Sequence, residues 1–169
     1  MRKPKRREST GIFPNTPAPR LARFGTGEAA RFLGIRIWRL QKFLDSPKYN
    51  LSPEGQLGEG HGSRRLFSVE DLYRMAIASA MVEDGFTAKV IGSVVRQIED
   101  YDLSVETYED KELPPARFMG LVRTSKGPQV ALYDAKSLPR FGKKGSPYYV
   151  LDIAELTGRV IQRIAKSAK

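Results

Sequence analysis

The sequence predicts a mainly helical fold with a small α+β region at its C-terminal end. Three observations support this class. Apolar residues recur at three- and four-residue spacings through much of residues 24–102, which is typical of amphipathic helices. The glycine-rich residues 51–65 interrupt this pattern and suit turns and a hairpin. After residue 116, two strand-like runs flank a turn signal, and a last amphipathic helix follows.

The first two helices are short and lie close together. Thr26 is the predicted N-cap of the first helix, and Gly34 is predicted to end it. The second helix is predicted over residues 36–44, where Ser46-Pro47 stops it. The brief loop between them predicts a compact pair of helices.

Two longer helices are predicted after the glycine-rich stretch. Ser68 to Asp71 resembles a capping box, with aspartate at the position usually given to glutamate. Gly85 is the predicted C-cap of this third helix, and Thr87 caps a fourth. Both helices show apolar stripes, so we expect them to supply much of the core.

The C-terminal part has a different pattern. Residues 118–123 and 129–133 predict a hairpin around Ser125-Lys126-Gly127-Pro128. A short run over residues 148–151 follows, and Asp152 with Glu155 predicts the cap of a final helix. Aromatic residues of this region either line a pocket or belong to the core: Tyr133, Phe141, Tyr148 and Tyr149.

These patterns divide the chain into four parts. Residues 1–23 are basic and rich in proline, so they predict a flexible arm that either contacts DNA or is a solvated leader. Residues 24–102 form the main helical domain. Residues 103–116 are an acidic linker, and residues 117–169 form a hairpin and helix for dimerisation or effector binding.

The composition limits the class of protein. Of 169 residues, 40% are hydrophobic and 28% are charged, which is typical of a folded soluble protein. Cysteine is absent and His61 is the single histidine, so thiol chemistry and Cys- or His-rich metal sites are excluded. No apolar run suits a membrane span or a secretory signal. We therefore expect a cytoplasmic protein without a metal, a cofactor or enzymatic activity.

Positive charge is in clear excess. The chain has 29 Lys and Arg against 19 Asp and Glu, a formal net charge of +10. Such an excess favours a polyanionic partner, nucleic acid before membrane. An ordinary basic protein remains the alternative, so the distribution of the charge has to decide.

The second helix has the strongest candidate surface. At about 100° per residue, Ile37, Leu40 and Leu44 share one face and are expected to lie in the core. The other side presents an aromatic ring, cations and an amide: Trp38, Arg39 and Lys42, with Arg36 at the helix start and Gln41 near the edge. On such a face arginine can bind guanine, lysine can contact phosphate and glutamine can reach adenine. The alternative is an ordinary solvated face.

The glycine-rich stretch adds further candidates. Gly60 and Gly62 indicate a turn, and Arg64 and Arg65 stand at the base of the strand that follows. We expect both arginines to lie along the phosphate backbone beside the groove that the second helix occupies. His61 is either a phosphate donor or an exposed loop histidine.

In this order the residues resemble the winged helix-turn-helix DNA-binding domain of MerR-type transcriptional regulators and related excisionase-like modules. Residues 28–35 are similar to the first helix and turn, residues 36–43 to the recognition helix, and residues 64–72 to the wing strand and next helix. Gly85-Phe86-Thr87 with Ile91 resembles the turn before the fourth helix. The resemblance covers residues 24–98.

The chain also departs from the family pattern. The family usually has arginine and then an aromatic residue after the buried leucine, whereas Gln41 and Lys42 follow Leu40 here. The long helix that normally pairs in the dimer is not evident, because residues 100–115 break the helical pattern. Metal sensing in the family uses cysteines, which this chain lacks.

The resemblance implies a homodimer that binds a near-palindromic promoter site in double-stranded DNA and regulates transcription at the nucleoid. RNA polymerase is a further candidate partner. Two other hypotheses stay open. One is an excisionase-like or architectural DNA-binding protein without an effector. The other is a protein-interaction adaptor in which Trp38 and neighbouring cations grip an acidic partner.

Overall fold

The computed structural model describes residues 23–53, 55–57, 64–98, 117–134, 136–137 and 145–167, with only the backbone described for residues 55–57 and Arg64. Several expectations lie outside these residues, among them the basic arm, the linker at 103–116, His61 and Phe141. The two predicted turn glycines Gly60 and Gly62 lie outside them as well.

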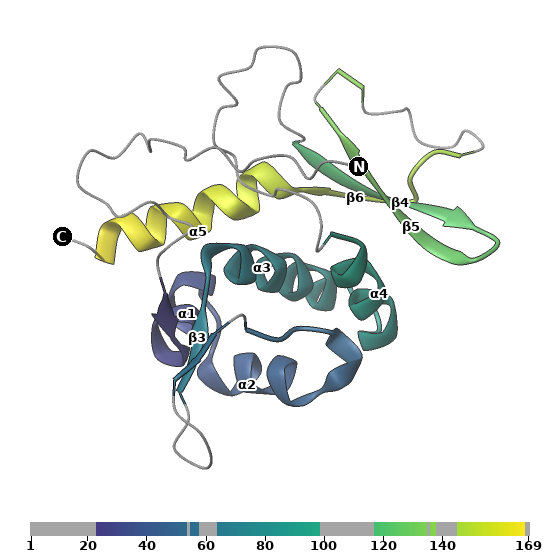
Figure 1. Cartoon of the computed structure of the whole chain (residues 1–169). Coiled ribbons are helices and arrows are strands. Elements are labelled where there is room, and N and C mark those ends of the chain that lie inside the picture. The colour runs from purple at the N-terminus through teal and green to yellow at the C-terminus, as the bar shows by residue number, and fades with distance from the viewer. Residues whose placement is uncertain are drawn as a thin grey trace, which may run out of the picture.

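The described residues form five α-helices, one short 3-10 helix and two three-stranded antiparallel sheets (Figure 1). In chain order the elements are β1 (Phe24–Gly25), α1 (Thr26–Leu33), α2 (Ile37–Asp45), η2 (Pro47–Tyr49), β2 (Gly55–Leu57), β3 (Arg64–Phe67), α3 (Val69–Glu83), α4 (Ala88–Ile98), β4 (Phe118–Thr124), β5 (Gly127–Tyr133), β6 (Tyr149–Asp152) and α5 (Ile153–Ser167). The fold is therefore helix-rich α+β, in agreement with the predicted class at that level.

Helices α1 and α2 are joined through a left-handed residue. Gly34 has φ 70°, and its N–H donates to the carbonyls of Ala30 and Arg31. This φ favours glycine, as predicted. The predicted N-cap of α1 is wrong by one residue, because Gly25 occupies that position and Thr26 is already helical. The Glu28 carboxylate accepts a hydrogen bond from the Gly25 N–H at 2.9 Å. A side chain three residues later in the chain thus provides a partner for the backbone N–H of the N-cap residue.

The first sheet has the strand order β1-β3-β2. Strand β3 pairs antiparallel with β2 in the register Leu57↔Arg64, which confirms the hairpin expected in the glycine-rich stretch. The sheet lies beside α1 and α2 at one end of the molecule (Figure 1). The hairpin and α2 therefore share one side of the protein.

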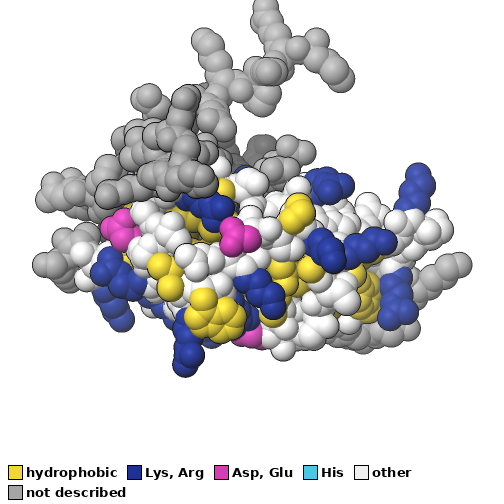
Figure 2. Space-filling view, turned by 90° about the horizontal axis from the view of Figure 1, so that it is seen from below, with side chains coloured by type: hydrophobic (Ala, Val, Ile, Leu, Met, Phe, Trp, Pro, Cys, Tyr) yellow, Lys and Arg dark blue, Asp and Glu magenta, His cyan; other side chains and the backbone are white. Residues whose placement is uncertain are grey.

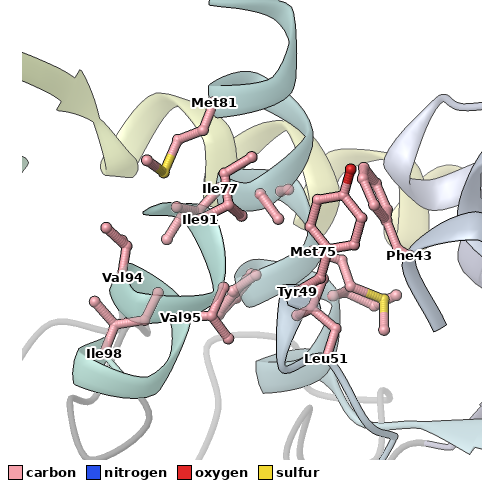
Figure 3. Packing of buried hydrophobic residues seen from close by; sticks show 14 of the residues in the cluster. Phe43, Tyr49, Leu51, Met75, Ile77, Met81, Ile91, Val94, Val95 and Ile98 are labelled. Carbon is pink, nitrogen blue, oxygen red and sulfur yellow. The ribbon is translucent and has the colours of Figure 1, made fainter. Parts of the chain in front are cut away.

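Helix α3 runs through the centre of the fold and is buried over most of its circumference. Ser68 and Asp71 form the predicted capping box. The Ser68 hydroxyl accepts from the Asp71 N–H at 3.1 Å, and the Asp71 carboxylate accepts from the Ser68 N–H at 2.9 Å. Helix α4 packs beside α3, and its apolar side chains meet those of α3 in the core (Figure 3). At Gly92 an added Cβ would overlap the Lys48 carbonyl, so α4 also lies directly against η2.

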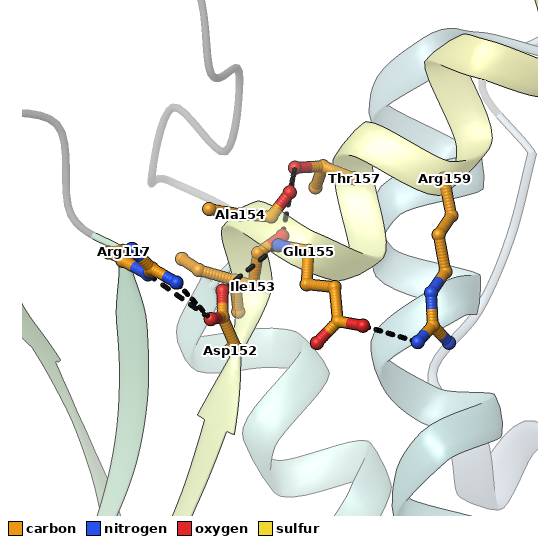
Figure 4. A network of polar contacts seen from close by, with 7 residues as sticks. All are labelled: Arg117, Asp152, Ile153, Ala154, Glu155, Thr157 and Arg159. Carbon is orange, nitrogen blue, oxygen red and sulfur yellow. Dashed lines mark hydrogen bonds and ion pairs between the residues drawn. The ribbon is translucent and has the colours of Figure 1, made fainter.

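The second sheet has the order β5-β4-β6, and α5 follows it directly. Met119 and Leu121 of β4 are fully buried. Asp152 caps α5 by accepting from the Glu155 N–H at 2.9 Å, as predicted, and its other carboxylate oxygen accepts from Arg117 at 3.1 Å (Figure 4). Helix α5 lies along α3 and α1.

Buried side chains of both halves form one hydrophobic cluster, to which β4, β5 and α5 contribute alongside α1, α2, α3 and α4. None of the helices in the described part of the chain is long and apolar enough to cross a membrane.

Candidate nucleic-acid interface

Helix α2 is fixed to the core by two side chains. Leu40 is fully buried, and Phe43 packs edge-to-face on Tyr49 with ring centroids 5.0 Å apart. Leu44 is half-buried, but Ile37 is 49% exposed, so the prediction that Ile37 lies in the core is wrong. Because Phe43 packs on Tyr49, the buried face of α2 is centred on Leu40 and Phe43, and Ile37 lies outside it.

The outward side of α2, with the residue before it, is called the α2 face here. Its members are Arg36, Ile37, Trp38, Gln41 and Lys42, all of them exposed. Trp38 is 56% exposed although it is the largest side chain of the helix. Among the residues that the structure describes, no hydrogen bond or ion pair engages the side chains of this set. The expectation that Trp38 and Lys42 project outward is therefore confirmed.

Arg39 lies differently from the prediction. Its Nη1 forms an ion pair with the Glu83 carboxylate at 3.1 Å, and its Nη2 donates to the Ser79 carbonyl at 3.3 Å. Its side chain is only 25% exposed. The orientation of α2 that exposes Ile37 also places Arg39 beside the C-terminal end of α3. Arg39 thus joins two helices, and the expectation that it projects outward is wrong.

The hairpin meets the C-terminal end of α2 through one ion pair. Arg65 of β3 lies 3.2 Å from the carboxylate of Asp45, and both side chains are substantially exposed. Arg65 therefore flanks α2 as expected, although it contacts a carboxylate of the protein itself. The side chain of Arg64 lies outside the described residues.

Asp45 is the residue of this surface that the sequence did not point to. Helical periodicity places it near Trp38 and Lys42, which lie seven and three residues earlier. Its pairing with Arg65 has no sequence signal, because the two residues are 20 positions apart and belong to different elements.

Positive charge surrounds the α2 face. Residues 23–50 hold six Lys or Arg and two acidic residues, a net charge of +4. Figure 2 views the molecule from the side on which α2 lies, and Lys and Arg side chains are spread over it with few acidic ones between them. An exposed aromatic ring and an amide within a basic surface are groups that bind bases and phosphates.

Tyr133 and Tyr149 of the C-terminal region pack against other parts of the protein. The Tyr149 hydroxyl donates to Asp84 at 2.7 Å, and its ring meets Phe86 with centroids 4.7 Å apart. Burial and the Asp84 carboxylate raise the pKa of Tyr149 well above its ordinary value. The ring of Tyr133 covers Gly120, and Tyr148 lies under the Arg123 guanidinium. These contacts favour the packing role for Tyr133 and Tyr149, whereas Tyr148 is 39% exposed.

No protein-family model matches this chain, and no curated protein matches it in sequence. The resemblance to MerR-type regulators consequently gains no support from these comparisons.

Proposed function

We propose that this protein binds double-stranded DNA, with α2 in the major groove and the β2–β3 hairpin beside it as a wing. The observation that carries the proposal is the α2 face. It presents Trp38, Gln41 and Lys42 outward from a helix that Leu40 and Phe43 hold rigidly to the core. A recognition helix of a helix-turn-helix protein needs this combination of a fixed inner side and a polar, aromatic outer side.

The dimensions and the charge support the same interface. Nine residues of α-helix span about 14 Å, and the major groove is ~12 Å wide and accepts one helix. The duplex has one negative charge per ~1.7 Å of its axis, and the region of α1, α2 and η2 has a net positive charge. Arg36, two residues before Trp38, and Lys42, four residues after it, are both exposed and would contact the phosphates that border the groove.

In its full form the proposal is a winged helix-turn-helix protein of the MerR type that acts as a dimeric transcriptional regulator. An excisionase-like or architectural protein would use the same surface. Selection of bound duplexes from a random pool would separate these roles, because a two-fold symmetric selected sequence is expected only of a dimer that binds two half-sites.

The charge dependence of binding tests the interface directly. Lys42→Ala should weaken binding to every duplex and lower the slope of log affinity against log salt by about one. Asp45→Asn should act in the opposite direction, because it removes a negative charge beside the phosphates and releases Arg65. Lys126→Ala is the matched control, since it removes one exposed cation from the β4–β5 turn. Equal effects of Lys42→Ala and Lys126→Ala would contradict the proposal.

One observation favours a second function. Ile37 and Trp38 are adjacent, large and exposed, and such pairs occur where proteins meet. In a protein-interaction adaptor they would anchor an acidic partner among the surrounding cations. Failure of the purified protein to bind any duplex at low salt would favour this function over DNA binding.

A further inference from the structure

The chemistry of the α2 face indicates which base pairs it would prefer. Three large hydrophobic side chains are exposed among the residues that the structure describes: Ile37, Trp38 and Tyr148. Two of them stand together in the first turn of α2. In a helix-turn-helix protein the N-terminal residues of the recognition helix approach the base edges. Ile37 and Trp38, with Arg36 before them, are therefore the positions expected to lie closest to the bases.

An amide lies next to this apolar pair. Gln41 follows Ile37 by four residues, so the two side chains are neighbours on the helix surface. A glutamine can form two hydrogen bonds with adenine, through N6 and N7. Thymine, on the same base pair, presents a C5-methyl group to the major groove, and apolar side chains are its natural contacts.

The arginine best suited to guanine is withdrawn from this surface. The Arg39 guanidinium contacts the Glu83 carboxylate and the Ser79 carbonyl, and Arg65 forms an ion pair with Asp45. Arg36 at the N-cap of α2 and Lys42 one turn after Trp38 are exposed and keep their charges available to phosphates or base edges. The middle of the α2 face thus has one amide and two apolar groups.

We propose that Ile37 and Trp38 contact thymine C5-methyl groups while Gln41 binds adenine, so that the protein prefers sites that carry thymine methyl groups in the major groove. This inference rests on the proposed function, because it requires α2 to enter the groove. It assigns no guanine contact to Arg39, which the sequence left as a candidate for one.

Removal of the methyl group alone tests the inference. The full chain is titrated against an alternating dA-dT duplex and against the same duplex with deoxyuridine in place of every thymidine. Base pairing and the other donors and acceptors of the major groove stay the same. We expect the dA-dT duplex to bind about tenfold more tightly.

Variants assign the effect to the named residues. The double variant Ile37→Ala/Trp38→Ala should bind the two duplexes equally, and since both side chains are exposed, the fold should be retained. Lys42→Ala is the control, and it should weaken both duplexes by the same factor and keep their ratio. A circular dichroism spectrum and an unfolding curve for each variant verify that it is folded.

The outcomes separate this inference from the function on which it rests. Equal affinities for the thymidine and deoxyuridine duplexes would overturn the inference and leave DNA binding in place. A methyl preference that survives in the double variant would overturn the role of Ile37 and Trp38. Absence of binding to both duplexes at low salt would overturn the proposed function itself.

Discussion

The C-terminal sheet and α5 are at least as rich in cations as the α2 face, and their described arginines differ in contacts from the arginine of that face, although exposed lysines such as Lys126 occur in both regions. Arg117 binds Asp152, Arg159 binds Glu155, Arg123 lies over Tyr148, and Arg163 donates to the Phe32 carbonyl (Figure 4 shows the first two). On the α2 face, Arg36 and Lys42 have no such partner among the described residues.

The difference shows that a positive charge count does not locate a binding surface. An arginine that satisfies a carboxylate or a carbonyl of its own protein contributes to the fold, and its charge is partly balanced there. A lysine on a rigid helix beside an exposed aromatic ring has its charge available to a phosphate. The contacts of each Lys or Arg side chain therefore say more about where a ligand could bind than the number of such residues does.

The largest effect is expected where α2 is attached to the core. Leu40→Ala should lower the free energy of unfolding by ~2–5 kcal/mol, because it removes a fully buried side chain and leaves a cavity. Trp38→Ala, two residues earlier on the exposed side, should change it by less than about 0.5 kcal/mol. Urea unfolding of both variants measures the contrast. A large loss in Trp38→Ala would mean that this ring packs against the protein and is not available to a ligand.

A smaller effect is expected where α5 holds the turn between α1 and α2. The Nη1 of Arg163 donates to the Phe32 carbonyl at 3.0 Å and its guanidinium covers Gly34. Arg163→Ala should cost about 1 kcal/mol of unfolding free energy, because a carbonyl at the end of α1 loses its partner.

Arg159 of the same helix provides the matched control for Arg163. It pairs with Glu155 one turn earlier, and both side chains are exposed. Arg159→Ala should cost no more than ~0.5 kcal/mol, since solvent screens such pairs. If the two variants lose the same stability in urea, the contact between α5 and the turn has no special role.

The Tyr149 contact predicts a stability that depends on pH. The pKa of Tyr149 is raised in the folded protein, so the folded state keeps its proton at pH values where the unfolded tyrosine, with an ordinary pKa near 10, has lost it. The contribution is complete below about pH 10 and is lost as the pH rises further. Tyr149→Phe should therefore show a shallower loss of stability above about pH 10 than the wild type, measured by urea unfolding across that range. Parallel curves for the two proteins would refute the linkage to Tyr149.

Local signals predicted much of this fold. The capping box at Ser68, the left-handed Gly34, the β4–β5 hairpin and the Asp152 cap each depend on residues a few positions apart, and all were found. Helix packing could not be predicted in the same way. The rotation of α2 depends on Phe43 meeting Tyr49 and on Arg39 meeting α3, and the second contact joins residues about 40 positions apart. A periodicity estimate for nine residues therefore predicted that Trp38 and Lys42 are exposed and was wrong for Ile37 and Arg39.

The rotation of α2 leads to the prediction with the smallest expected effect. Arg39 pairs with Glu83 and with the Ser79 carbonyl, so it is not expected to reach a base. Arg39→Ala should leave the ratio of affinities for a preferred and a random duplex unchanged, whereas loss of a base contact would reduce that ratio by about tenfold. Duplex titration at one salt concentration measures the ratio, with Gln41→Ala as the comparison that should reduce it. A collapse of the ratio in Arg39→Ala would mean that the guanidinium leaves Glu83 when DNA binds, because the contact seen in the isolated protein cannot coexist with a bond to guanine.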